Sequence, residues 1–384
     1  MQKQNKLFIA QSGGPTAVIN SSLAGIIAAA QNSGVIAGIY GLFNGLEGAL
    51  KEEIVDLTHL SRQEIQLLRH TPAAALGGSR YIMKEEDYRQ AVRFLEKQGA
   101  GHFLFIGGNG TMGTCHKLKQ VAEEMGVAMT VNGVPKTIDN DLVGLDHAPG
   151  YASAARYVAL AVKAQGADLR SMRTFEQVRI IETMGRAVGW LAAASALAQE
   201  HPEDPPHLVY LPEVPLAIND FLEDVQKMYR RHGYVVAVVG EGMKDVNGHP
   251  IGCEQFQNEE GTRPVIVGAS EHLSKLVKSR LGLVARSQNL GMTQRSFSEC
   301  VSLFDEEFAY ECGRAAFLAS MEGKKGRMIW QDGDLPLKKV AGLVQTYPNY
   351  FYDMGKKQPT SAFHQWLSPL IGSMPSYFNI HLKD

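Results

Sequence analysis

The chain has 384 residues, of which 45% are hydrophobic and 20% charged, and its 38 lysines and arginines nearly balance its 40 aspartates and glutamates. This composition is typical of a folded globular protein and excludes a disordered chain. Basic residues never form runs longer than two, so we expect no nucleic-acid partner and no anionic membrane surface as a partner.

Length and residue usage also bear on domain number and location. A chain of this length predicts two domains rather than one core. The polar start predicts no signal peptide, and no apolar span of about 18 residues would cross a bilayer. The four cysteines have neither metal-like spacing nor the density of a disulfide framework: Cys115, Cys253, Cys300 and Cys312. We therefore expect a cytoplasmic protein.

The first predicted unit is a strand over Leu7–Gln11, a break at Ser12-Gly13-Gly14-Pro15 and a helix that ends near Gln31. This arrangement aims main-chain N–H groups at an anion, although a plain strand-to-helix connection has the same pattern. A second strand is predicted over Val35–Tyr40. The small-residue turn Gly77–Arg80 adds a cation, although such turns are also common on ordinary surfaces.

A second glycine loop follows the next predicted strand. That strand, Phe103–Ile106, has no polar face, which is typical of a parallel sheet covered on both sides. It runs into Gly107-Gly108-Asn109-Gly110-Thr111 and a helix that ends near Glu124. Three glycines between a strand and a helix N-terminus allow close approach of the main chain to phosphate. Taken alone, the loop also suits a dinucleotide.

The most polar stretch follows a strand predicted over Val127–Val131, and it reads Val-Pro-Lys-Thr-Ile-Asp-Asn-Asp from position 134 to 141. Carboxylates two residues apart on an extended segment point to different sides, so Asp139 and Asp141 can have different tasks. Lys136 adds positive charge. A site with both signs suits transfer of an anionic group to a hydroxyl, with a base for the hydroxyl and a cation for the developing charge.

The second half of the chain continues the alternation of strands and helices. Helices are predicted over Tyr151–Ala167, after Arg186 to about Gln199, over Ala217–Arg231, around Leu273–Leu281 and over Phe304–Met321. Strands are predicted over Val178–Glu182, Leu208–Leu211, Tyr234–Val239, Leu283–Ala285 and Met328–Trp330. At least seven such alternations predict an α/β protein with doubly wound, mostly parallel sheets.

Polar groups follow several of these strands. They are Met184-Gly185-Arg186, Gly240-Glu241-Gly242, and Arg286 with the segment Gly291–Arg295. Open α/β sheets bind ligands beyond the carboxyl ends of their strands, and the two arginines suit a phosphate. The aromatic residues of the tail are expected in the core or in an interface: Tyr347, Phe351, Phe363, Trp366 and Phe378.

Together these pieces resemble the phosphofructokinase family, which moves a phosphoryl group onto the 1-hydroxyl of fructose 6-phosphate. The matching pieces occur in the family's order: Ser12–Gly14, Gly77–Arg80, Gly107–Thr111, Pro135–Asp141, Met184–Arg186, Gly240–Gly242 and Gly291–Arg295. The run Pro-Lys-Thr-Ile-Asp-Asn-Asp followed by Met-Gly-Arg is highly specific. The resemblance implies a glycolytic kinase that produces fructose 1,6-bisphosphate.

The resemblance also implies the domains and the role of each residue. It implies two doubly wound three-layer domains, with residues 1–150 and about 294–345 binding the donor and residues 151–293 and about 346–384 binding the sugar phosphate. Asp139 would be the base, flanked by Thr137, Asp141 and Lys136. The donor would be bound by Gly14, Arg80, Gly108, Asn109, Gly110 and Thr111, and the sugar phosphate by Met184, Gly185, Arg186, Glu241, Arg286, Met292 and Arg295.

Two positions bear on the identity of the donor. Pyrophosphate users of this family resemble one another in having aspartate at the place of Gly110 together with lysine at the place of Lys136. Gly110 leaves the room that a nucleotide needs, and we therefore expect ATP, with pyrophosphate as the alternative. Mg²⁺ is the expected cofactor. Asn109 would be its ligand in place of the family's usual aspartate, and it contributes an oxygen without charge.

Two further departures concern the acceptor. Met292 occupies a position that is usually polar, and Gln177 stands where many ATP-dependent members have an arginine that reaches across from another subunit. Another ketose phosphate therefore stays open as the substrate, as does a non-catalytic sugar-phosphate sensor. A dinucleotide oxidoreductase is the third alternative, but the spaced Gly-x-Gly-x-x-Gly motif is missing. The resemblance also implies a homodimer or homotetramer.

Overall fold

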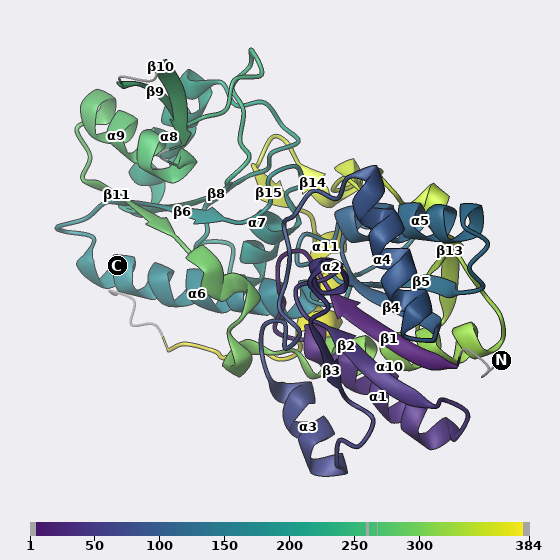
Figure 1. Ribbon diagram of the computed structural model, residues 1–384. Coiled ribbons are helices and arrows are strands. Elements are labelled where there is room, and N and C mark those ends of the chain that lie inside the picture. Colours follow the sequence, from purple (N-terminus) through teal and green to yellow (C-terminus); the bar gives the residue numbers. More distant parts are fainter. Residues whose placement is uncertain (1–4, 259–260, 267, 379–384) are drawn as a thin grey trace. The chain divides into compact units, whose positions relative to one another are not determined.

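The computed structural model describes residues 5–258, 261–266 and 268–378, without the side chains of 253–266. The chain forms two compact units (Figure 1). Unit 1 comprises Met1–Ala154 and Arg295–Gln345, and unit 2 comprises Ala155–Gln294 and Thr346–Asp384. Each unit thus combines a segment from the first half of the chain with one from near its end.

Unit 1 is built on a seven-stranded sheet in the order β13-β12-β5-β4-β1-β2-β3. Its strands are β1 (Lys6–Gln11), β2 (Gly38–Leu42), β3 (Ile54–Asp56), β4 (Ala100–Gly107), β5 (Thr130–Pro135), β12 (Arg327–Trp330) and β13 (Gly333–Pro336). The five central strands are parallel, and only the edge strands β3 and β13 run antiparallel to their neighbours. The carboxyl ends of β1, β4 and β5 therefore meet at one edge of the sheet.

Helices cover both faces of this sheet, with α1 and α10 on one face and α4 and α5 on the other (Figure 1). The helical segments of unit 1 are α1 (Ile19–Ser33), α2 (Glu47–Lys51), α3 (Arg62–His70), α4 (Glu85–Lys97), α5 (Asn109–Glu124), η3 (Ser298–Cys300), α10 (Leu303–Met321) and η4 (Leu337–Lys339). A Cβ on Gly25 would lie 2.1 Å from the Tyr310 carbonyl oxygen, and one on Gly313 would lie 2.0 Å from that of Ser22. Glycine in each helix therefore allows α1 and α10 to pack with their main chains in contact.

Unit 2 contains a four-stranded parallel sheet in the order β11-β6-β8-β7. Its strands are β6 (Val178–Thr183), β7 (Leu208–Tyr210), β8 (Val235–Gly240) and β11 (Ala285–Asn289). Helices α8 (Ile218–His232) and α9 (Ala269–Leu281) lie on one face, and α6 (Tyr151–Met172) and α7 (Trp190–Ala194) lie on the other (Figure 1). The turn η1 (Ser195–Ala198) continues α7. Each sheet thus forms a three-layer structure.

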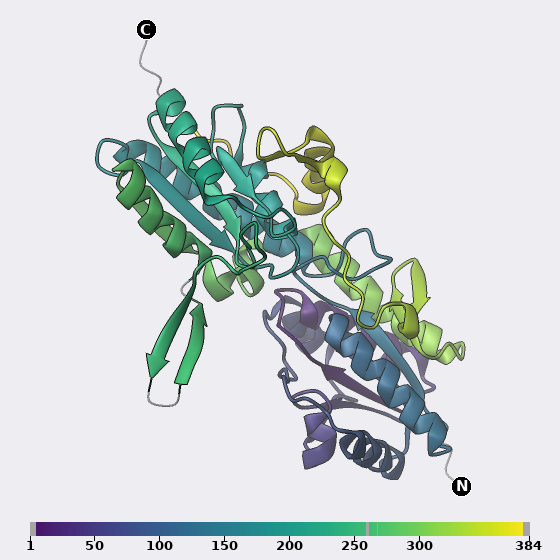
Figure 2. The same ribbon diagram turned by 90° about the horizontal axis from the view of Figure 1, so that it is seen from above.

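Two further parts complete unit 2. The antiparallel hairpin of β9 (Cys253–Asn258) and β10 (Gly261–Ile266) stands apart from the four-stranded sheet (Figure 2). Residues 346–378 contain η5 (Asn349–Phe351), the short pair β14 (Tyr352–Asp353) and β15 (Gln358–Pro359), and α11 (Ser361–Ile371).

The tail packs through its aromatic residues against Trp190 on α7. The ring centre of Trp190 lies 5.0 Å from that of Tyr347 and 5.3 Å from that of Trp366. Phe363 is fully buried in the same cluster. Phe378 is 92% exposed and lies beyond the cluster at the end of the described chain, so it has no core position, and an interface position stays a prediction for it.

The predicted fold class is confirmed, and several predicted strands differ from the observed ones in their bounds. The second strand begins at Gly38 rather than Val35, because α1 ends at Gly34 with φ +64° and Val35 is 55% exposed. The strand after α5 continues to Pro135 rather than ending at Val131, because Pro135 pairs at the very end of β4, where its missing N–H is tolerated.

Three cysteines, Cys115, Cys300 and Cys312, are buried and form no disulfide among the described residues, and the side chain of Cys253 lies outside the described part. Within the described residues, no helix combines the length and the apolar character needed to cross a membrane.

Candidate active site

The segment that follows β5 carries the two predicted carboxylates. Thr137 forms a parallel bridge with Gly150. The Asp139 amide donates to the Thr137 hydroxyl oxygen at 3.1 Å. Asn140 takes the left-handed conformation with φ +53°, and its side-chain oxygen accepts a hydrogen bond from a main-chain amide eight residues later. Residues 137–150 therefore form a loop that is bonded across its base and inside, with Asp139 half-buried near its start.

Lys136 is buried immediately before this loop, with only 2% of its surface exposed. Its ammonium group donates to the Gly14 carbonyl oxygen at 2.5 Å. Burial lowers the pKa of Lys136 to about 8; the charges of Asp139 and Asp141 oppose this shift, and that of Arg295 adds to it. A cation in such a low-dielectric position interacts strongly with a nearby anion.

The glycine loops and the Gly77–Arg80 turn come together in unit 1. The Lys136 amide donates to the Gly107 carbonyl oxygen at 3.0 Å, which joins the second glycine loop to the polar stretch. A Cβ on Gly78 would lie 3.0 Å from the Gly13 carbonyl oxygen. The first glycine loop therefore has the polar stretch on one side and the Gly77–Arg80 turn on another.

Two arginines differ in their relation to the first glycine loop. One guanidinium nitrogen of Arg295 lies 3.0 Å from the point where a Cβ on Gly14 would be, so the absence of a side chain lets this cation approach the loop. Arg80 is exposed. Gly14 thus has two cationic neighbours, Lys136 and Arg295.

The second glycine loop is shorter than predicted because α5 already begins at Asn109. Gly108 precedes the helix in an extended conformation. A Cβ on Gly107 would lie 2.1 Å from the Thr111 hydroxyl oxygen, whereas one on Gly110 would meet no atom within 4 Å. The first turn of α5, with amides that have no partner inside the helix, lies at the carboxyl end of β4 and can receive an anion.

Asn109 and Asp141 provide oxygens that fit the predicted Mg²⁺. The Asn109 amide nitrogen donates to Asp141 Oδ2 at 2.8 Å and to its main-chain oxygen at 3.1 Å. The other side-chain oxygen of each residue is buried and has no hydrogen-bond partner among the described residues. Mg²⁺ takes one or two such oxygens and completes its shell with water and phosphate. The described chain contains no cluster of three or more His, Cys, Asp or Glu side chains that could hold a metal ion.

In unit 2, the predicted sugar-binding segment follows β6 directly. The Met184 amide donates to Gln294 Oε1 at 3.0 Å, and Gly185 has φ +116°. Arg186 Nε lies 3.6 Å from Glu241 Oε1, and 84% of the Arg186 side chain is exposed. Burial raises the pKa of Glu241, and the charge of Arg186 opposes this shift. The two side chains form a paired group at the carboxyl ends of β6 and β8.

Gly242 is required for this pairing. A Cβ at this position would lie 1.8 Å from the Arg186 carbonyl oxygen. The Glu241 amide donates to the Thr183 carbonyl oxygen at 2.9 Å. The segment Gly240–Gly242 therefore lies directly against Met184–Arg186.

The residues predicted for the 6-phosphate are divided between the units. Arg286 belongs to β11 of unit 2 rather than to a turn after a strand; its Nε lies 3.3 Å from the buried Glu176 carboxylate, and its guanidinium group lies 5.7 Å from the ring centre of Phe175. Met292, also in unit 2, is 61% exposed on η2 (Gly291–Arg295). Arg295 belongs to unit 1.

Residues 6–319 match the family model described as Phosphofructokinase. The chain belongs to the phosphofructokinase family. It is 35% identical over 377 residues to the sulfofructose kinase of Alkalicoccus urumqiensis, with 96% of each chain covered. It is 33% identical over 394 residues to the pyrophosphate–fructose 6-phosphate 1-phosphotransferase of Rhodospirillum rubrum, with 98% of this chain and 97% of the relative covered. The resemblance predicted from the seven motifs is thus confirmed.

The fold agrees with solved phosphofructokinases. The pyrophosphate-dependent phosphofructokinase of Nitrosospira multiformis matches with a TM-score of 0.87 at 32% identity, covering 98% of this chain and 94% of that one. The two three-layer α/β units therefore have the architecture of this family.

Sequence reasoning assigns no role to two buried residues beside the phosphofructokinase motifs. Gln294 holds the Met184 amide, and Asp305 binds the end of loop 137–150. Gln294 belongs to the motif Gly291–Arg295, and this position could have indicated a role for it. Asp305 has no such signal, because an acid in the first turn of a helix is ordinary.

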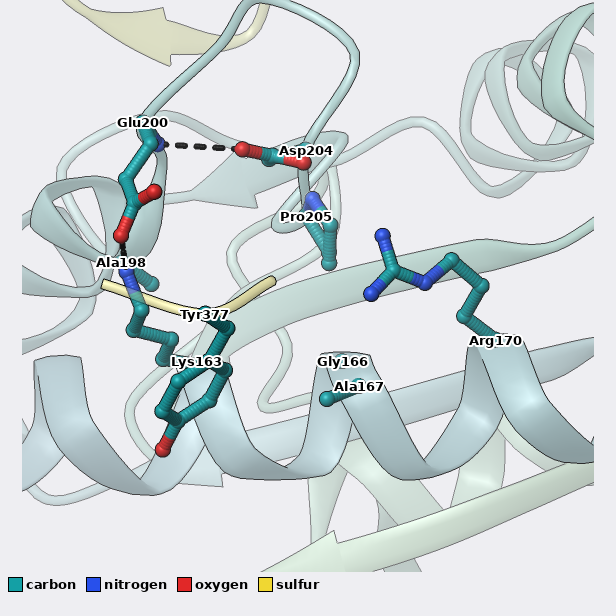
Figure 3. Close-up of a pocket in the computed structure, with 9 residues that line it drawn as sticks. All are labelled: Lys163, Gly166, Ala167, Arg170, Ala198, Glu200, Asp204, Pro205 and Tyr377. Carbon is teal, nitrogen blue, oxygen red and sulfur yellow. Dashed lines mark hydrogen bonds and ion pairs between the residues drawn. The ribbon is translucent and has the colours of Figure 1, made fainter. Parts of the chain in front are cut away.

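Figure 3 shows a pocket of this phosphofructokinase that lies in unit 2 and contains none of the predicted residues. Lys163 on α6 is paired with the Glu200 carboxylate, and its ammonium group lies 5.2 Å from the ring centre of Tyr377. The pocket volume of about 30 Å³ leaves room for one or two water molecules. We assign no substrate to it.

Proposed function

We propose that this phosphofructokinase transfers a phosphoryl group from pyrophosphate to the 1-hydroxyl of fructose 6-phosphate and so forms fructose 1,6-bisphosphate. The observation that carries this proposal is the gathering of Lys136, Asp139 and the Gly14 loop at the carboxyl ends of β1 and β5. Phosphoryl transfer needs little covalent chemistry from the protein and depends on positioning and charge stabilisation. A buried cation beside a half-buried carboxylate provides both.

In the proposed reaction, Asp139 accepts the proton of the sugar hydroxyl as the hydroxyl oxygen forms its bond to phosphorus. The bond between that phosphorus and the leaving phosphate breaks, and the leaving group takes up the negative charge. Lys136 and Arg80 stabilise the charge on the donor, and the amides of the Gly14 loop and of the first turn of α5 bind its oxygens. The hydrogen bond from the Asp139 main-chain amide to the Thr137 hydroxyl oxygen holds the main chain of the base in place within the loop.

Asn109 and Asp141 would hold Mg²⁺ through the two orphaned oxygens described above. When bound, the ion neutralises charge on the phosphoryl oxygens. The residues of unit 2 are assigned to the acceptor: Arg186 and Glu241 to the sugar hydroxyls, and Arg286 to the distal anionic group.

Two arguments support pyrophosphate as the donor. Lysine at position 136 is the residue that pyrophosphate users of the family have there, and its ammonium group is aimed at the first glycine loop. The relative from Rhodospirillum rubrum and the structure from Nitrosospira multiformis both carry pyrophosphate-dependent names. ATP remains the second candidate, because the space around Gly110 is open and would admit the α-phosphate of a nucleotide.

A second acceptor is sulfofructose, the substrate named for the relative from Alkalicoccus urumqiensis. Met292 favours it, because a thioether has no hydrogen-bond donor to offer where a phosphate is usually met by a polar side chain. Gln177 also supplies no positive charge; its side-chain oxygen accepts a hydrogen bond from the Val284 amide at 2.9 Å. Of the residues predicted for the 6-phosphate, Arg286 is therefore the one cation that belongs to unit 2.

The deciding experiment measures turnover for the four combinations of two donors (pyrophosphate, ATP) and two acceptors (fructose 6-phosphate, sulfofructose), with Mg²⁺. Formation of orthophosphate or ADP is followed together with the ³¹P signal of the new phosphate ester. We expect the highest kcat/KM with pyrophosphate and fructose 6-phosphate. Faster turnover with ATP would overturn the donor assignment, faster turnover of sulfofructose would overturn the acceptor assignment, and no turnover in any combination would refute the proposed function.

The resemblance also implies that subunits assemble. A homodimer or homotetramer stays a prediction, and light scattering on the purified protein measures it.

A further inference from the structure

Asp305 in the first turn of α10 is fully buried, yet its carboxylate has no ion pair with a lysine or arginine among the described residues. It accepts three hydrogen bonds instead. The Gly150 amide donates to Oδ1 at 2.9 Å, and the Ser153 amide and hydroxyl donate to Oδ2 at 2.9 and 2.6 Å. A carboxylate removed from water is costly unless such donors receive it.

The donors belong to the start of another helix. Helix α6 begins at Tyr151, so the amides of Gly150 and Ser153 are among those with no partner inside the helix. The positive end of the α6 dipole also favours a carboxylate at this place. Burial raises the pKa of Asp305, and the hydrogen bonds from Ser153 and Gly150 oppose this shift. Asp305 thus caps α6 from a helix that lies more than 130 residues later in the sequence.

The same contacts reach the proposed base in three short steps. Gly150, which is held by Asp305, is bridged to Thr137 across the base of loop 137–150. The Thr137 hydroxyl oxygen accepts the amide of Asp139. All of these residues belong to unit 1. The position of Asp139 therefore depends on an anchor at the opposite end of its loop.

A second contact fastens the same end of the loop to α10. The ring of His147 lies 4.5 Å from that of Phe308 and 5.1 Å from that of Phe304, measured between centres. This packing keeps the loop on the helix but has no direction, whereas the three hydrogen bonds to Asp305 fix a geometry. The ring packing therefore holds the loop against α10, and the hydrogen bonds to Asp305 fix the position of the loop on that helix.

We propose that Asp305 is a positioning residue for phosphoryl transfer, which fixes loop 137–150 so that Asp139 meets the acceptor hydroxyl. This inference rests on the proposed function, because it takes Asp139 as the base. A displacement of about 1 Å at a reacting group costs on the order of 100-fold in rate. Substrate binding depends on other segments and is affected much less.

The main test compares Asp305→Asn with Glu306→Gln. Asparagine keeps the shape of the side chain but turns one acceptor oxygen into a donor, which then faces the Gly150 or Ser153 donors. Glu306 is the next residue of the same helix and is also buried, but its carboxylate contacts His70 at 2.6 Å and not the loop. For Asp305→Asn we expect kcat to fall about 10- to 100-fold with KM for fructose 6-phosphate within about threefold, and for Glu306→Gln we expect neither change.

Ser153 supplies a milder test that does not depend on the folding of the Asp305 variant. Ser153→Ala removes one of the three hydrogen bonds and should lower kcat less than Asp305→Asn does. Ser153→Thr keeps the hydroxyl and should restore most of the loss. In the double variant Asp305→Asn/Ser153→Ala, the loss should be smaller than the product of the two single losses, because both changes remove the same contact.

Hydrogen exchange gives a readout that does not need activity. Main-chain amides of residues 137–153 should exchange faster in Asp305→Asn than in the wild type, and at the wild-type rate in Glu306→Gln. Wild-type exchange of this segment in folded Asp305→Asn, or a kcat within twofold of the wild type, would overturn the proposal. A wild-type enzyme without any turnover would instead refute the proposed function, and the exchange measurement would still decide whether Asp305 anchors the loop.

Discussion

Lys136 gives the most quantitative prediction, because its burial has a measurable effect on both stability and rate. The side chain is 2% exposed, and its pKa is lowered from 10.5 to about 8. Each tenfold change in proton affinity corresponds to about 1.36 kcal/mol. The folded protein therefore carries a cost of about 3 kcal/mol for keeping this ammonium group charged at neutral pH.

The sign of the pH dependence follows from proton binding. Between pH 8 and 10.5 the unfolded chain keeps the proton on Lys136 and the folded protein loses it, so the unfolded state binds more protons and stability rises with pH. Below pH 8 both states are protonated and the cost is fully present. Lysine burial thus has the opposite effect to a salt-bridged lysine, whose stabilisation is lost as pH rises.

The perturbation is Lys136→Met, which keeps the length and apolar character of the side chain and removes the titrating group. The free energy of unfolding is measured by urea denaturation for the wild type and the variant at pH 7 and at pH 10. Other titrating groups cancel in the comparison. We expect the wild type to gain roughly 2 to 3 kcal/mol relative to the variant between these two pH values. A difference that does not change with pH would refute the lowered pKa.

The rate provides the second half of the same test. If the charged ammonium group stabilises the transferring phosphoryl group, kcat/KM of the wild type should fall about tenfold per pH unit above pH 8. Lys136→Met should lower kcat/KM at pH 7 and abolish this decline. A wild-type profile that stays level to pH 9.5, together with a confirmed pKa, would show that the charge on Lys136 has no part in the reaction.

Two further predictions concern donor choice and the tail. Gly110→Asp places a carboxylate in the open space at the first turn of α5. Because this carboxylate repels the nucleotide phosphates, the substitution should lower kcat/KM for ATP at least about tenfold more than kcat/KM for pyrophosphate. Gly110→Ala is the uncharged control, and an equal loss for both donors would contradict the role of this position. Trp190→Ala empties the centre of the aromatic cluster and should lower the free energy of unfolding by about 3–5 kcal/mol, whereas Phe378→Ser should change it by less than about 0.5 kcal/mol. Thermal and urea denaturation measure both, and a loss under about 1 kcal/mol for Trp190→Ala would show that the tail does not depend on this cluster.

The sequence was sufficient to predict strands that lie in sheets covered by helices on both faces. Strands β4 and β8 are almost entirely apolar because helices cover both faces of their sheets. The prediction for β8 is within one residue at each end, whereas β4 extends beyond the predicted Phe103–Ile106 at both ends. Strand β11 was placed too early, because four of its five residues are exposed at the edge of a sheet and give no apolar signal. The hairpin β9–β10 was not predicted, because its residues show no clear alternation of apolar and polar side chains.

The candidate site also has one part that the sequence indicates and one part that it does not. Motif residues such as Lys136 and Asp139 could be proposed from the sequence, because glycine loops and paired charges are unusual there. Contacts made by residues far apart in the chain were not predictable. Nothing in the sequence indicates that Asp305 would meet Gly150, because that contact depends on how α10 packs beside β5.

The most direct test of the central claim is the kcat of Asp139→Ser with pyrophosphate and fructose 6-phosphate. Asp146→Ser is the matched control, since Asp146 is a carboxylate of the same loop with a side chain that is 74% exposed. A base that acts in the transition state predicts a fall of about 10²- to 10⁴-fold in kcat with little change in KM, and a control close to the wild type. A loss below about tenfold in Asp139→Ser, or an equal loss in both variants, would contradict the assignment of Asp139 as the base.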